Sequence, residues 1–263
     1  MRVVVLGSQG MLGSVVFKYL RKAHMDVVAL DARWCPENAS ILMERLLSLV
    51  PDACVNAVGI LPGRGACSEN MSWVNGTLPG WIASRLPVSC VFVHPSSDAV
   101  FASTCGGCHW DTLQQPDSLY GQSKQQGELG LRRLNDRIIR SSIVGIEKGP
   151  PRSLLSWFLA CEQTVSGYIN HQWNGITTLE WSQLCHRILS GGMPDANRVL
   201  QPGVLPPLSK YSLLKMTARI FGHSISIKPV KSATTISRTL VPNPLSRGLE
   251  AQLCELREWH ACH

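Results

Sequence analysis

The chain has 263 residues, of which 44% are hydrophobic, so it can build one large domain or one domain with a smaller lobe. Its formal net charge of +7 would suit a polyanionic partner, but Lys and Arg are scattered along the chain, so we do not expect nucleic-acid binding. The 10 cysteines occur in a chain long enough to form a core, which argues against the disulfide framework of a small secreted domain.

The N-terminal stretch MRVVVLGSQGMLGSVVFKYL has the basic start and apolar run of a signal peptide, but Gly7, Gly10 and Gly13 interrupt that run. We therefore interpret it as mature structure. The chain contains no run of about 18 apolar residues, so no membrane span is expected. These features predict a cytoplasmic protein with reduced thiols and no membrane partner.

A dinucleotide site is predicted by the first strand and the loop after it. Residues 3–6 are a β-branched-rich run typical of a buried parallel strand, and GSQGMLG follows directly at residues 7–13. Apolar residues then recur at helical spacing. Glycines at these positions allow a tight turn, close approach of a diphosphate and close packing of the helix, whose N-terminal amides favour an anion.

The second predicted strand, residues 27–30, ends in Asp31, where a carboxylate is expected to meet the adenosine ribose hydroxyls. Arg33 lies two residues further on and could accept a 2′-phosphate. We therefore expect NADPH or NADH as the cofactor and leave the choice between them open.

The alternation of strands and helices continues through the first half of the chain. We predict a helix at 41–50 ended by Pro51, a strand at 53–58, a helical stretch at 73–86 interrupted by Gly76 and Pro79-Gly80, and a strand at 88–94. This rhythm predicts an α/β Rossmann fold with a doubly wound parallel sheet, whose ligands lie at the carboxyl ends of the strands.

We expect residues 1–148 to form the NAD(P)-binding domain. Residues 149–263 would complete the sheet and form a small C-terminal substrate-binding lobe, with a helix at 249–259. The segment after about residue 190 is rich in proline and glycine and carries no motif that we interpret.

Three residues suggest carbonyl reduction. Tyr120 and Lys124 are four apart on a predicted helix and so share one face, while Ser97 follows the fourth strand. A serine hydroxyl can hydrogen-bond a carbonyl, and a tyrosine can protonate its oxygen as hydride arrives. A free phenol has a pKa of about 10, and a nearby ammonium favours its ionised form. A solvated helix face is the alternative interpretation of Tyr120 and Lys124.

The motifs resemble those of the extended short-chain dehydrogenase/reductase superfamily, and within it the dTDP-4-dehydrorhamnose reductase family. The resemblance extends over about residues 1–185 and rests on the segments GSQGMLG, LD, NAV, SSDAVF and YGQSKQQGE. It implies an NAD(P)H-dependent reductase of a nucleotide-activated 4-keto-deoxysugar with Ser97, Tyr120 and Lys124 as catalytic residues.

The resemblance also implies the residues that contact each ligand. The cofactor contacts are expected at Gly7, Gln9, Gly10, Met11, Leu12, Gly13, Asp31, Ala32, Arg33, Asn56, Ala57, Val58, Gly59, Ser96, Tyr120 and Lys124. The substrate contacts are expected at Leu61, Ser97, Asp98, Ala99, Ile143, Trp173 and Arg238, with the last as a pyrophosphate contact by analogy or else a surface arginine.

Two departures from the family pattern alter the predicted substrate pocket. Ala99 and Ile143 stand where the family has aromatic residues that face the sugar. We therefore expect a nucleotide-activated keto-deoxysugar other than the rhamnose precursor itself. We expect no metal, and a homodimer is one option for the assembly.

Two alternative functions use the same fold. The first is a nucleotide-sugar epimerase or dehydratase, but epimerases run longer at the C-terminus and dehydratases usually have Asp-Glu after the catalytic Ser/Thr, where this chain has Asp98-Ala99. The second is a non-catalytic dinucleotide-binding regulatory subunit. The complete set of Ser97, Tyr120 and Lys124 argues against it.

The segment Cys105-Gly106-Gly107-Cys108-His109 matches the attachment motif of a c-type haem. Without a signal peptide for export, haem attachment is not expected, and without a second Cys-x-x-Cys pair neither is a tetrahedral zinc site. A redox-labile pair is one interpretation. We favour a glycine-rich turn with two reduced thiols.

Overall fold

The computed structural model describes residues 1–62, 67–192 and 198–262. The chain divides into two compact units whose segments alternate along the sequence. Unit 1 contains residues 1–102, 113–140 and 182–200, and unit 2 contains residues 103–112, 141–181 and the chain from residue 201 onward. None of the helices in the described residues combines the length and apolar character required to cross a membrane.

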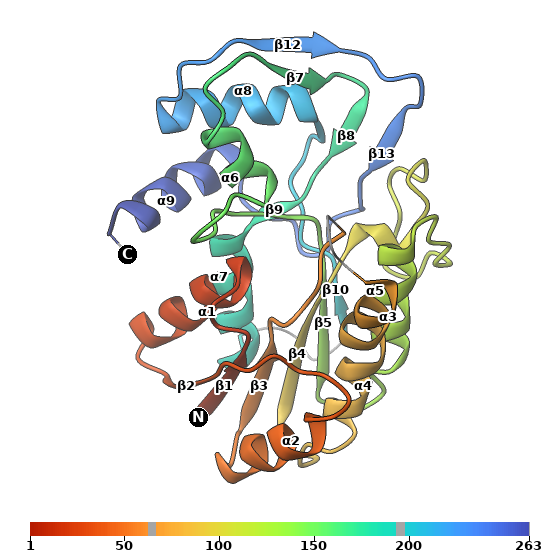
Figure 1. Ribbon diagram of the computed structural model, residues 1–263, viewed down its shortest axis with the longest axis vertical. Coiled ribbons are helices and arrows are strands. Elements are labelled where there is room, and N and C mark those ends of the chain that lie inside the picture. Colours follow the sequence, from red (N-terminus) through yellow and green to blue (C-terminus); the bar gives the residue numbers. More distant parts are fainter. Residues whose placement is uncertain (63–66, 193–197, 263) are drawn as a thin grey trace. The chain divides into compact units, whose positions relative to one another are not determined.

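Unit 1 is built on a six-stranded parallel sheet with the strand order β10-β5-β4-β3-β1-β2 (Figure 1). The chain runs from β1 outward to β2 and then returns past β1 to β3, so the winding direction changes between β1 and β3. This confirms the predicted doubly wound Rossmann-like sheet. The strands are β1 (Arg2–Leu6), β2 (Asp26–Leu30), β3 (Ala53–Asn56), β4 (Val91–Ser96), β5 (Asp136–Arg140) and β10 (Val199–Leu200).

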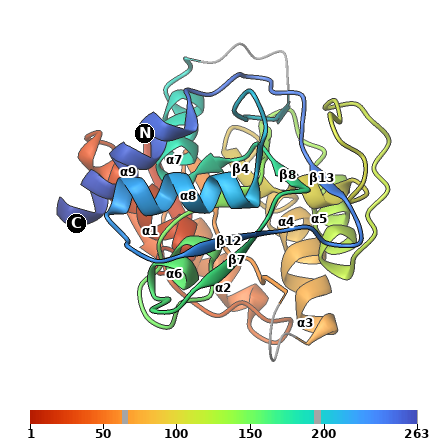
Figure 2. The same cartoon turned by 90° about the horizontal axis from the view of Figure 1, so that it is seen from above.

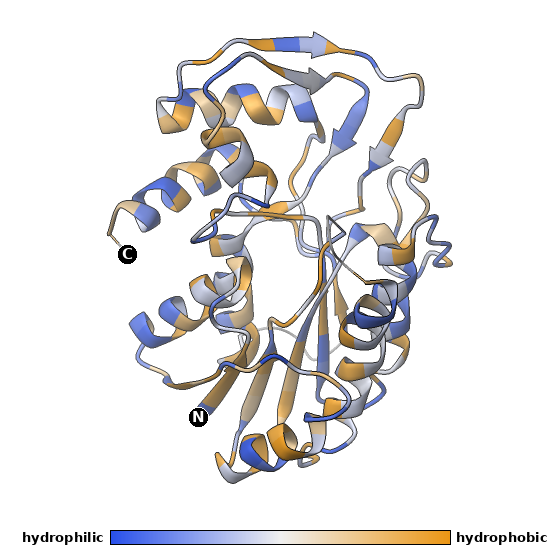
Figure 3. Cartoon of the chain, viewed as in Figure 1, coloured by the Kyte–Doolittle hydropathy of each residue, from blue (hydrophilic) through white to orange (hydrophobic). Residues whose placement is uncertain are grey.

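Helices cover both faces of this sheet, and its apolar strands appear orange in Figure 3. Leu42 and Leu46 of α2 and Ile82 of α4 pack with Val4 and Phe92 of the strands in one buried cluster. In Figure 1, α1 lies on the other side of the sheet from α4 and α5. The helices of unit 1 include α1 (Met11–Lys22), α2 (Ala39–Ser48), α4 (Leu78–Ala83) and α5 (Leu119–Leu129), while α7 (Thr178–Leu189) passes from unit 2 into unit 1.

The prediction that Gly76 and Pro79-Gly80 interrupt a helix at 73–86 is wrong. The chain is helical without a break through α3 (Ser68–Met71), the π-helix η1 (Ser72–Thr77) and α4. A Cβ on Gly76 would lie 2.6 Å from Gln126 Oε1, and one on Gly80 would lie 2.9 Å from Gly130 Cα. These glycines therefore allow close packing against α5, and Pro79 follows the π-helix near the beginning of α4.

Two strand boundaries also differ from the prediction. β3 ends at Asn56 rather than at Val58, because the Asn56 side chain accepts a hydrogen bond from Val58 N at 3.2 Å and turns the chain. β4 runs from Val91 to Ser96 rather than over 88–94, so Ser97 is the first residue beyond its carboxyl end.

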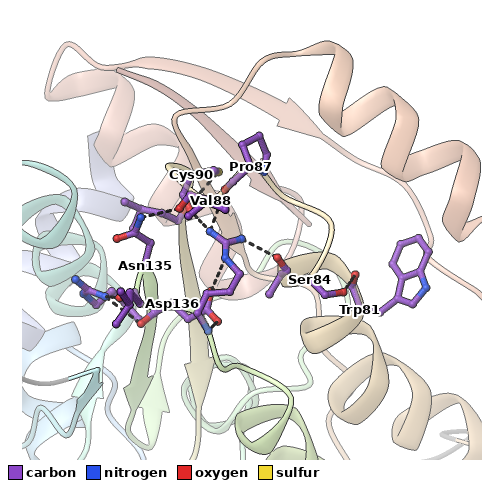
Figure 4. Close-up of polar contacts among 12 residues, drawn as sticks. Trp81, Ser84, Pro87, Val88, Cys90, Asn135 and Asp136 are labelled. Atoms are coloured by element: carbon purple, nitrogen blue, oxygen red, sulfur yellow. Dashed lines mark hydrogen bonds and ion pairs between the residues drawn. The ribbon is translucent and has the colours of Figure 1, made fainter.

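The amino ends of β4 and β5 are held by side chains that capture main-chain carbonyls (Figure 4). Asn135 Nδ2 donates to Val88 O at 2.8 Å, and the Arg133 guanidinium donates to Ala83 O at 2.7 Å, to Pro87 O at 3.2 Å and to Cys90 O. These contacts fix the end of the sheet opposite to the one that would bind ligands.

Unit 2 consists of small sheets and helices. Helix α8 (Lys210–Phe221) lies beside the parallel pair of β7 (Val165–Tyr168) and β12 (Ile227–Val230), as both views show (Figures 1 and 2). Phe158, Val165 and Leu214 form a buried core there. The other elements are η2 (Asp98–Val100) of unit 1 and, in unit 2, β6 (Ile143–Val144), α6 (Leu154–Leu159), β8 (His171–Trp173), β9 (Ile176–Thr177), β11 (Leu208–Ser209), β13 (Ile236–Arg238) and α9 (Leu249–Cys262).

The helix predicted at 249–259 is confirmed, although α9 extends to Cys262. Helix α8 was not predicted, because its residues lie in the proline- and glycine-rich segment without a recognisable motif. Its beginning is marked by Ser209, whose hydroxyl accepts a hydrogen bond from Ser212 N at 3.1 Å, and its end by Gly222 in the left-handed conformation at φ 66°.

Candidate active site

The glycine loop after β1 meets the end of β3 at the point where the winding direction of the sheet changes. Gly7 has a φ of 73°, and a Cβ on it would lie 3.2 Å from Ala57 O. A Cβ on Gly13 would lie 2.2 Å from Gly7 O, which no side chain could tolerate without a shift of the backbone. Glycine is thus required at both positions because main-chain atoms lie close by. The loop lies where the winding direction changes, which is where ligands bind in such sheets.

Asp31 at the end of β2 holds the same loop. Its carboxylate accepts hydrogen bonds from Ser8 N at 2.8 Å, from Ser8 Oγ at 2.7 Å and from Gln9 Nε2 at 3.0 Å. The predicted ribose contact is exposed and lies beside the predicted diphosphate loop. Arg33 is exposed as well, and Asn38 Nδ2 donates to its carbonyl at 2.9 Å.

The N-terminus of α1 has the chemistry that an anion requires. Its N-cap is the exposed Gly10, and in this fully described segment no side chain caps the helix and no acidic residue lies in its first turn. The main-chain N–H groups of that turn therefore keep their positive electrostatic potential. The amide of Gly10 donates to Gly7 O at 3.1 Å, so a dinucleotide diphosphate at this loop would meet the main-chain amides of Met11 and Leu12.

Ser97 follows β4 and begins the short helix η2. Its hydroxyl accepts from Ala99 N at 3.1 Å and donates to Asp98 Oδ1 at 2.9 Å. Ser97, Asp98 and Ala99 are all buried. Three predicted site residues therefore form one compact turn at the carboxyl end of the sheet.

Helix α5 places the other two predicted catalytic residues beside this turn. Its first turn carries the half-buried Tyr120, and a Cβ on the next residue, Gly121, would lie 2.1 Å from Ala99 O. One turn further on, Lys124 is 5% exposed and its Nζ donates to Pro95 O in β4 at 2.6 Å. Helix α5 thus packs against η2 at Gly121 and against the end of β4 at Lys124, and Tyr120 precedes Gly121 in the same turn.

Burial alters the basicity of Lys124. Loss of solvent around its ammonium lowers the pKa from 10.5 to about 8, although the carboxylate of Glu128 opposes this shift. The side chain of Lys124 therefore remains mainly cationic at neutral pH. Among the described residues, its ammonium has one hydrogen-bond acceptor, Pro95 O.

His94, which the sequence analysis did not single out, lies under the site in β4. It is fully buried, its ring nitrogen Nδ1 lies 3.2 Å from Asn56 Nδ2, and its Nε2 has no partner among the described residues. Because the amide nitrogen Nδ2 of Asn56 can only donate, Nδ1 of His94 is the acceptor and its proton is on Nε2. Burial, aided by the charge of Lys124, lowers the pKa of His94 well below its usual range, so the ring is neutral.

Asn75 is a second buried residue that sequence reasoning missed. From the π-helix η1 it pairs with the main chain of Ile60, accepting from Ile60 N at 2.9 Å and donating to Ile60 O at 2.8 Å. Its Nδ2 also lies 3.2 Å from Ser123 Oγ in α5. Asn75 thereby fixes the strand-end segment after β3 next to α5, and the π-helix was the unpredicted feature that sets its position.

The glutamate at the end of YGQSKQQGE has a structural role. Glu128 accepts from Arg140 Nε at 2.9 Å and from Arg140 Nη2 at 2.6 Å, and both residues are buried. Arg140 lies at the end of β5, so this bidentate pair fixes α5 to the sheet. Gln114 Nε2 donates to the same carboxylate at 2.6 Å and ties down the chain before α5.

The predicted substrate residues are divided between the units. Leu61 is an exposed residue of unit 1. In unit 2, Trp173 of β8 and Arg238 of β13 are directly opposite one another on parallel strands, and the Nζ of Lys210 lies 5.4 Å from the centre of the Trp173 ring. Ile143 lies in a separate strand of unit 2, β6, paired with β9. In addition to the turn at residues 97–99 of unit 1, the structure thus brings Trp173 and Arg238 together in unit 2. Lys210, which sequence analysis did not identify, lies over Trp173.

The model of the RmlD substrate binding domain family matches residues 1–150 of the 263. Among curated proteins, none is similar enough in sequence to match the chain. Within the described residues, no group of three or more His, Cys, Asp or Glu side chains is arranged to hold a metal ion.

Solved structures with the same fold are distant in sequence. A dTDP-4-dehydrorhamnose reductase from Clostridium acetobutylicum is 14% identical, with 99% of this chain and 100% of that chain covered and a TM-score of 0.82. The same enzyme from Bacillus anthracis, in complex with NADP, is 15% identical over 97% and 98% of the two chains, with a TM-score of 0.84. An L-threonine 3-dehydrogenase from Trypanosoma brucei is 15% identical over 100% and 98%, with a TM-score of 0.78. Because this fold carries different reactions, the likeness to these structures supports the architecture alone.

Proposed function

Because the chain belongs to the RmlD substrate binding domain family, within the extended short-chain dehydrogenase/reductase superfamily, we propose that it is an NAD(P)H-dependent reductase of a nucleotide-activated 4-keto-deoxysugar. The observation that carries this proposal is the buried ammonium of Lys124, one helical turn from Tyr120 and held against the strand that leads into Ser97. A buried charge with so few partners is costly in a merely structural role and is typical of a functional site.

In the proposed reaction, the bound dinucleotide supplies the hydride to the carbonyl carbon. Ser97 donates a hydrogen bond to the carbonyl oxygen, and Tyr120 transfers its proton to that oxygen as negative charge develops. The ammonium of Lys124 stabilises the phenolate that remains. The Ser97 hydroxyl now donates to Asp98, so this hydrogen bond must break before the hydroxyl can donate to the substrate carbonyl.

The dinucleotide would lie along the glycine loop, with its diphosphate at the N-terminus of α1 and its ribose at Asp31. Ser96, whose buried hydroxyl has no partner among the described residues, would complete the site near the nicotinamide end. Trp173 and Arg238 of unit 2 would contact the nucleotide sugar, with Arg238 on the pyrophosphate. Ala99 and Ile143 stand where the family has aromatic residues, so the proposed substrate is a nucleotide-activated keto-deoxysugar other than the rhamnose precursor.

The test is turnover of reduced dinucleotide with a panel of nucleotide-linked 4-keto-deoxysugars, for the parent chain and for Tyr120→Phe. Tyr120→Phe keeps the ring and removes the proton donor, so turnover should fall by roughly 10²–10⁴ while dinucleotide affinity, measured by fluorescence titration, stays the same. Tyr19→Phe is the matched control, because it makes the same change at a half-buried tyrosine of α1.

Two results would count against the proposal. If Tyr120→Phe turned over as fast as the parent, the catalytic assignment would be wrong. If the parent bound the dinucleotide tightly but reduced none of the keto-sugars, the protein would be a regulatory subunit rather than a reductase.

A further inference from the structure

The Cys-x-x-Cys segment of unit 2 brings two thiols into contact. Neither Cys105 nor Cys108 is in a disulfide, and their Sγ atoms are 2.8 Å apart. This distance is longer than the about 2.05 Å of a disulfide and shorter than the about 3.5–4.0 Å of ordinary van der Waals contact. The two sulfur atoms are therefore positioned so that a covalent bond between them needs only a small movement.

The main chain fixes one of the two cysteines firmly. Cys108 N donates to Thr239 O at 3.2 Å, and Cys108 O accepts from Val241 N at 2.9 Å and from Gln201 Nε2 at 3.2 Å. The side chain of Cys108 is 3% exposed. Cys108 therefore has a fixed position but little direct access to reagents in solution.

The other cysteine is presented to solvent by the two glycines between them. Cys105 is exposed. A Cβ on Gly106 would lie 2.2 Å from Ser237 Oγ, and Gly107 has a φ of 70° that side chains rarely adopt. Gly107 thus allows the tight turn that returns Cys105 to Cys108, and Gly106 allows close packing of this turn against Ser237.

We propose that Cys105 and Cys108 are a dithiol modification site that closes to a disulfide by exchange with a low-molecular-weight disulfide such as oxidised glutathione. The exposed Cys105 attacks as the thiolate, forms a mixed disulfide and releases one glutathione thiol. The Cys108 thiolate then attacks Cys105 Sγ and releases the second glutathione thiol. Two protein thiols are oxidised and one glutathione disulfide is reduced to two thiols, with each protein proton passing to a leaving thiolate.

A metal-binding role is a weaker interpretation of the same pair. No third His, Cys, Asp or Glu joins the two thiols in a metal-binding group within the described chain. Closure to a disulfide needs two sulfur atoms only. It is independent of the proposed reductase activity, since its readout is the state of the thiols.

The experiment equilibrates the whole folded chain with mixtures of reduced and oxidised glutathione, quenches with an alkylating agent and maps the peptides by mass spectrometry. The Cys105–Cys108 peptide should lose the mass of two hydrogen atoms and both alkylation sites, in mixtures that leave the exposed Cys67 and Cys262 free to be alkylated. Those two thiols are the internal controls, because each stands without a neighbouring cysteine in the sequence.

Single variants separate the two steps. Cys108→Ser should stop at a stable glutathione adduct on Cys105, and Cys105→Ser should leave the buried Cys108 without an adduct. The proposal is overturned if the parent accumulates the glutathione adduct on Cys105 without closing, or if Cys105 and Cys108 stay reduced while Cys67 and Cys262 are modified. The measurements on the parent decide the matter even if a variant fails to fold.

Discussion

The glycine loop after β1 and the contact between β4 and α5 lie at the same end of one sheet, but they are built in opposite ways. The loop is specified by space: main-chain atoms lie where Gly7 or Gly13 would carry a Cβ, and the carboxylate of Asp31 accepts hydrogen bonds from Ser8 and Gln9 of the loop. The β4–α5 contact buries Lys124, whose ammonium has one hydrogen-bond acceptor, and His94, whose Nε2 has no partner among the described residues.

The difference teaches how stability and chemistry are distributed in unit 1. Enlarging Gly7 or Gly13 should destabilise the fold, because main-chain atoms lie where the added Cβ would be. Replacing a buried polar residue at the β4–α5 contact by an apolar one of similar size should stabilise the fold, because an uncompensated desolvation cost disappears. Sites where a protein retains such costs are expected to be functional.

The largest effect on stability is expected at Gly13. Gly13→Ala places a Cβ 2.2 Å from Gly7 O, so the free energy of unfolding should fall by about 3 kcal/mol or more. Gly10→Ala is the matched control, since its Cβ would meet Gly7 O at 3.4 Å, an ordinary contact. Urea unfolding should show a large loss for Gly13→Ala and little for Gly10→Ala. Equal losses would show that close packing does not specify this loop.

The second effect is a pH dependence that originates in His94. Its folded pKa lies well below its unfolded value of about 6.5, so the unfolded state binds more protons below about pH 6.5 and stability falls as the pH decreases. His94→Gln keeps an acceptor for Asn56 but cannot titrate. Between about pH 6.5 and 5, the free energy of unfolding of His94→Gln should depend on pH less steeply than that of the parent, by up to about 1.4 kcal/mol per pH unit. An unchanged pH dependence would mean that the pKa of His94 is not lowered in the folded state.

The smallest effect is expected at Asp31. Asp31→Ala removes the proposed acceptor of the 2′-hydroxyl and a charge that repels a 2′-phosphate, so NADH affinity should fall about tenfold and NADPH affinity less. Ser8→Ala is the control, because it removes one loop contact of the carboxylate and keeps its charge. Equal weakening of both dinucleotides by Asp31→Ala would limit Asp31 to holding the loop. Should Arg33→Ala cost mainly NADPH affinity, the chain is adapted to NADP.

The sequence predicted most of what depends on local pattern. The parallel sheet of unit 1, the glycine loop and the turn from β4 into Ser97 follow from periodicity, glycine spacing and strand ends. The roles of Ser97, Tyr120 and Lys124 came from the resemblance and from their chemistry, and they stay a proposal.

What the sequence did not predict depends on contacts between distant residues. Gly76 and Gly80 suggest helix breaks locally, and only the proximity of Gln126 and Gly130 shows that they serve packing. The neutral state of His94 needs Asn56 from another strand. Helix α8 lacks a motif, because its stability in unit 2 depends on packing against β7 and β12.

The most direct test of this comparison is the free energy of unfolding of Lys124→Met measured beside its turnover. Because burial lowers the pKa of Lys124 from 10.5 to about 8, its charge destabilises the folded state fully below about pH 8, and this cost declines as the pH rises toward the unfolded value. At about pH 7, Lys124→Met should be more stable than the parent by about 2–3 kcal/mol and should have lost its reductase turnover, with the gain in stability shrinking above about pH 8. A variant that is less stable than the parent, or that still turns over, would contradict the account.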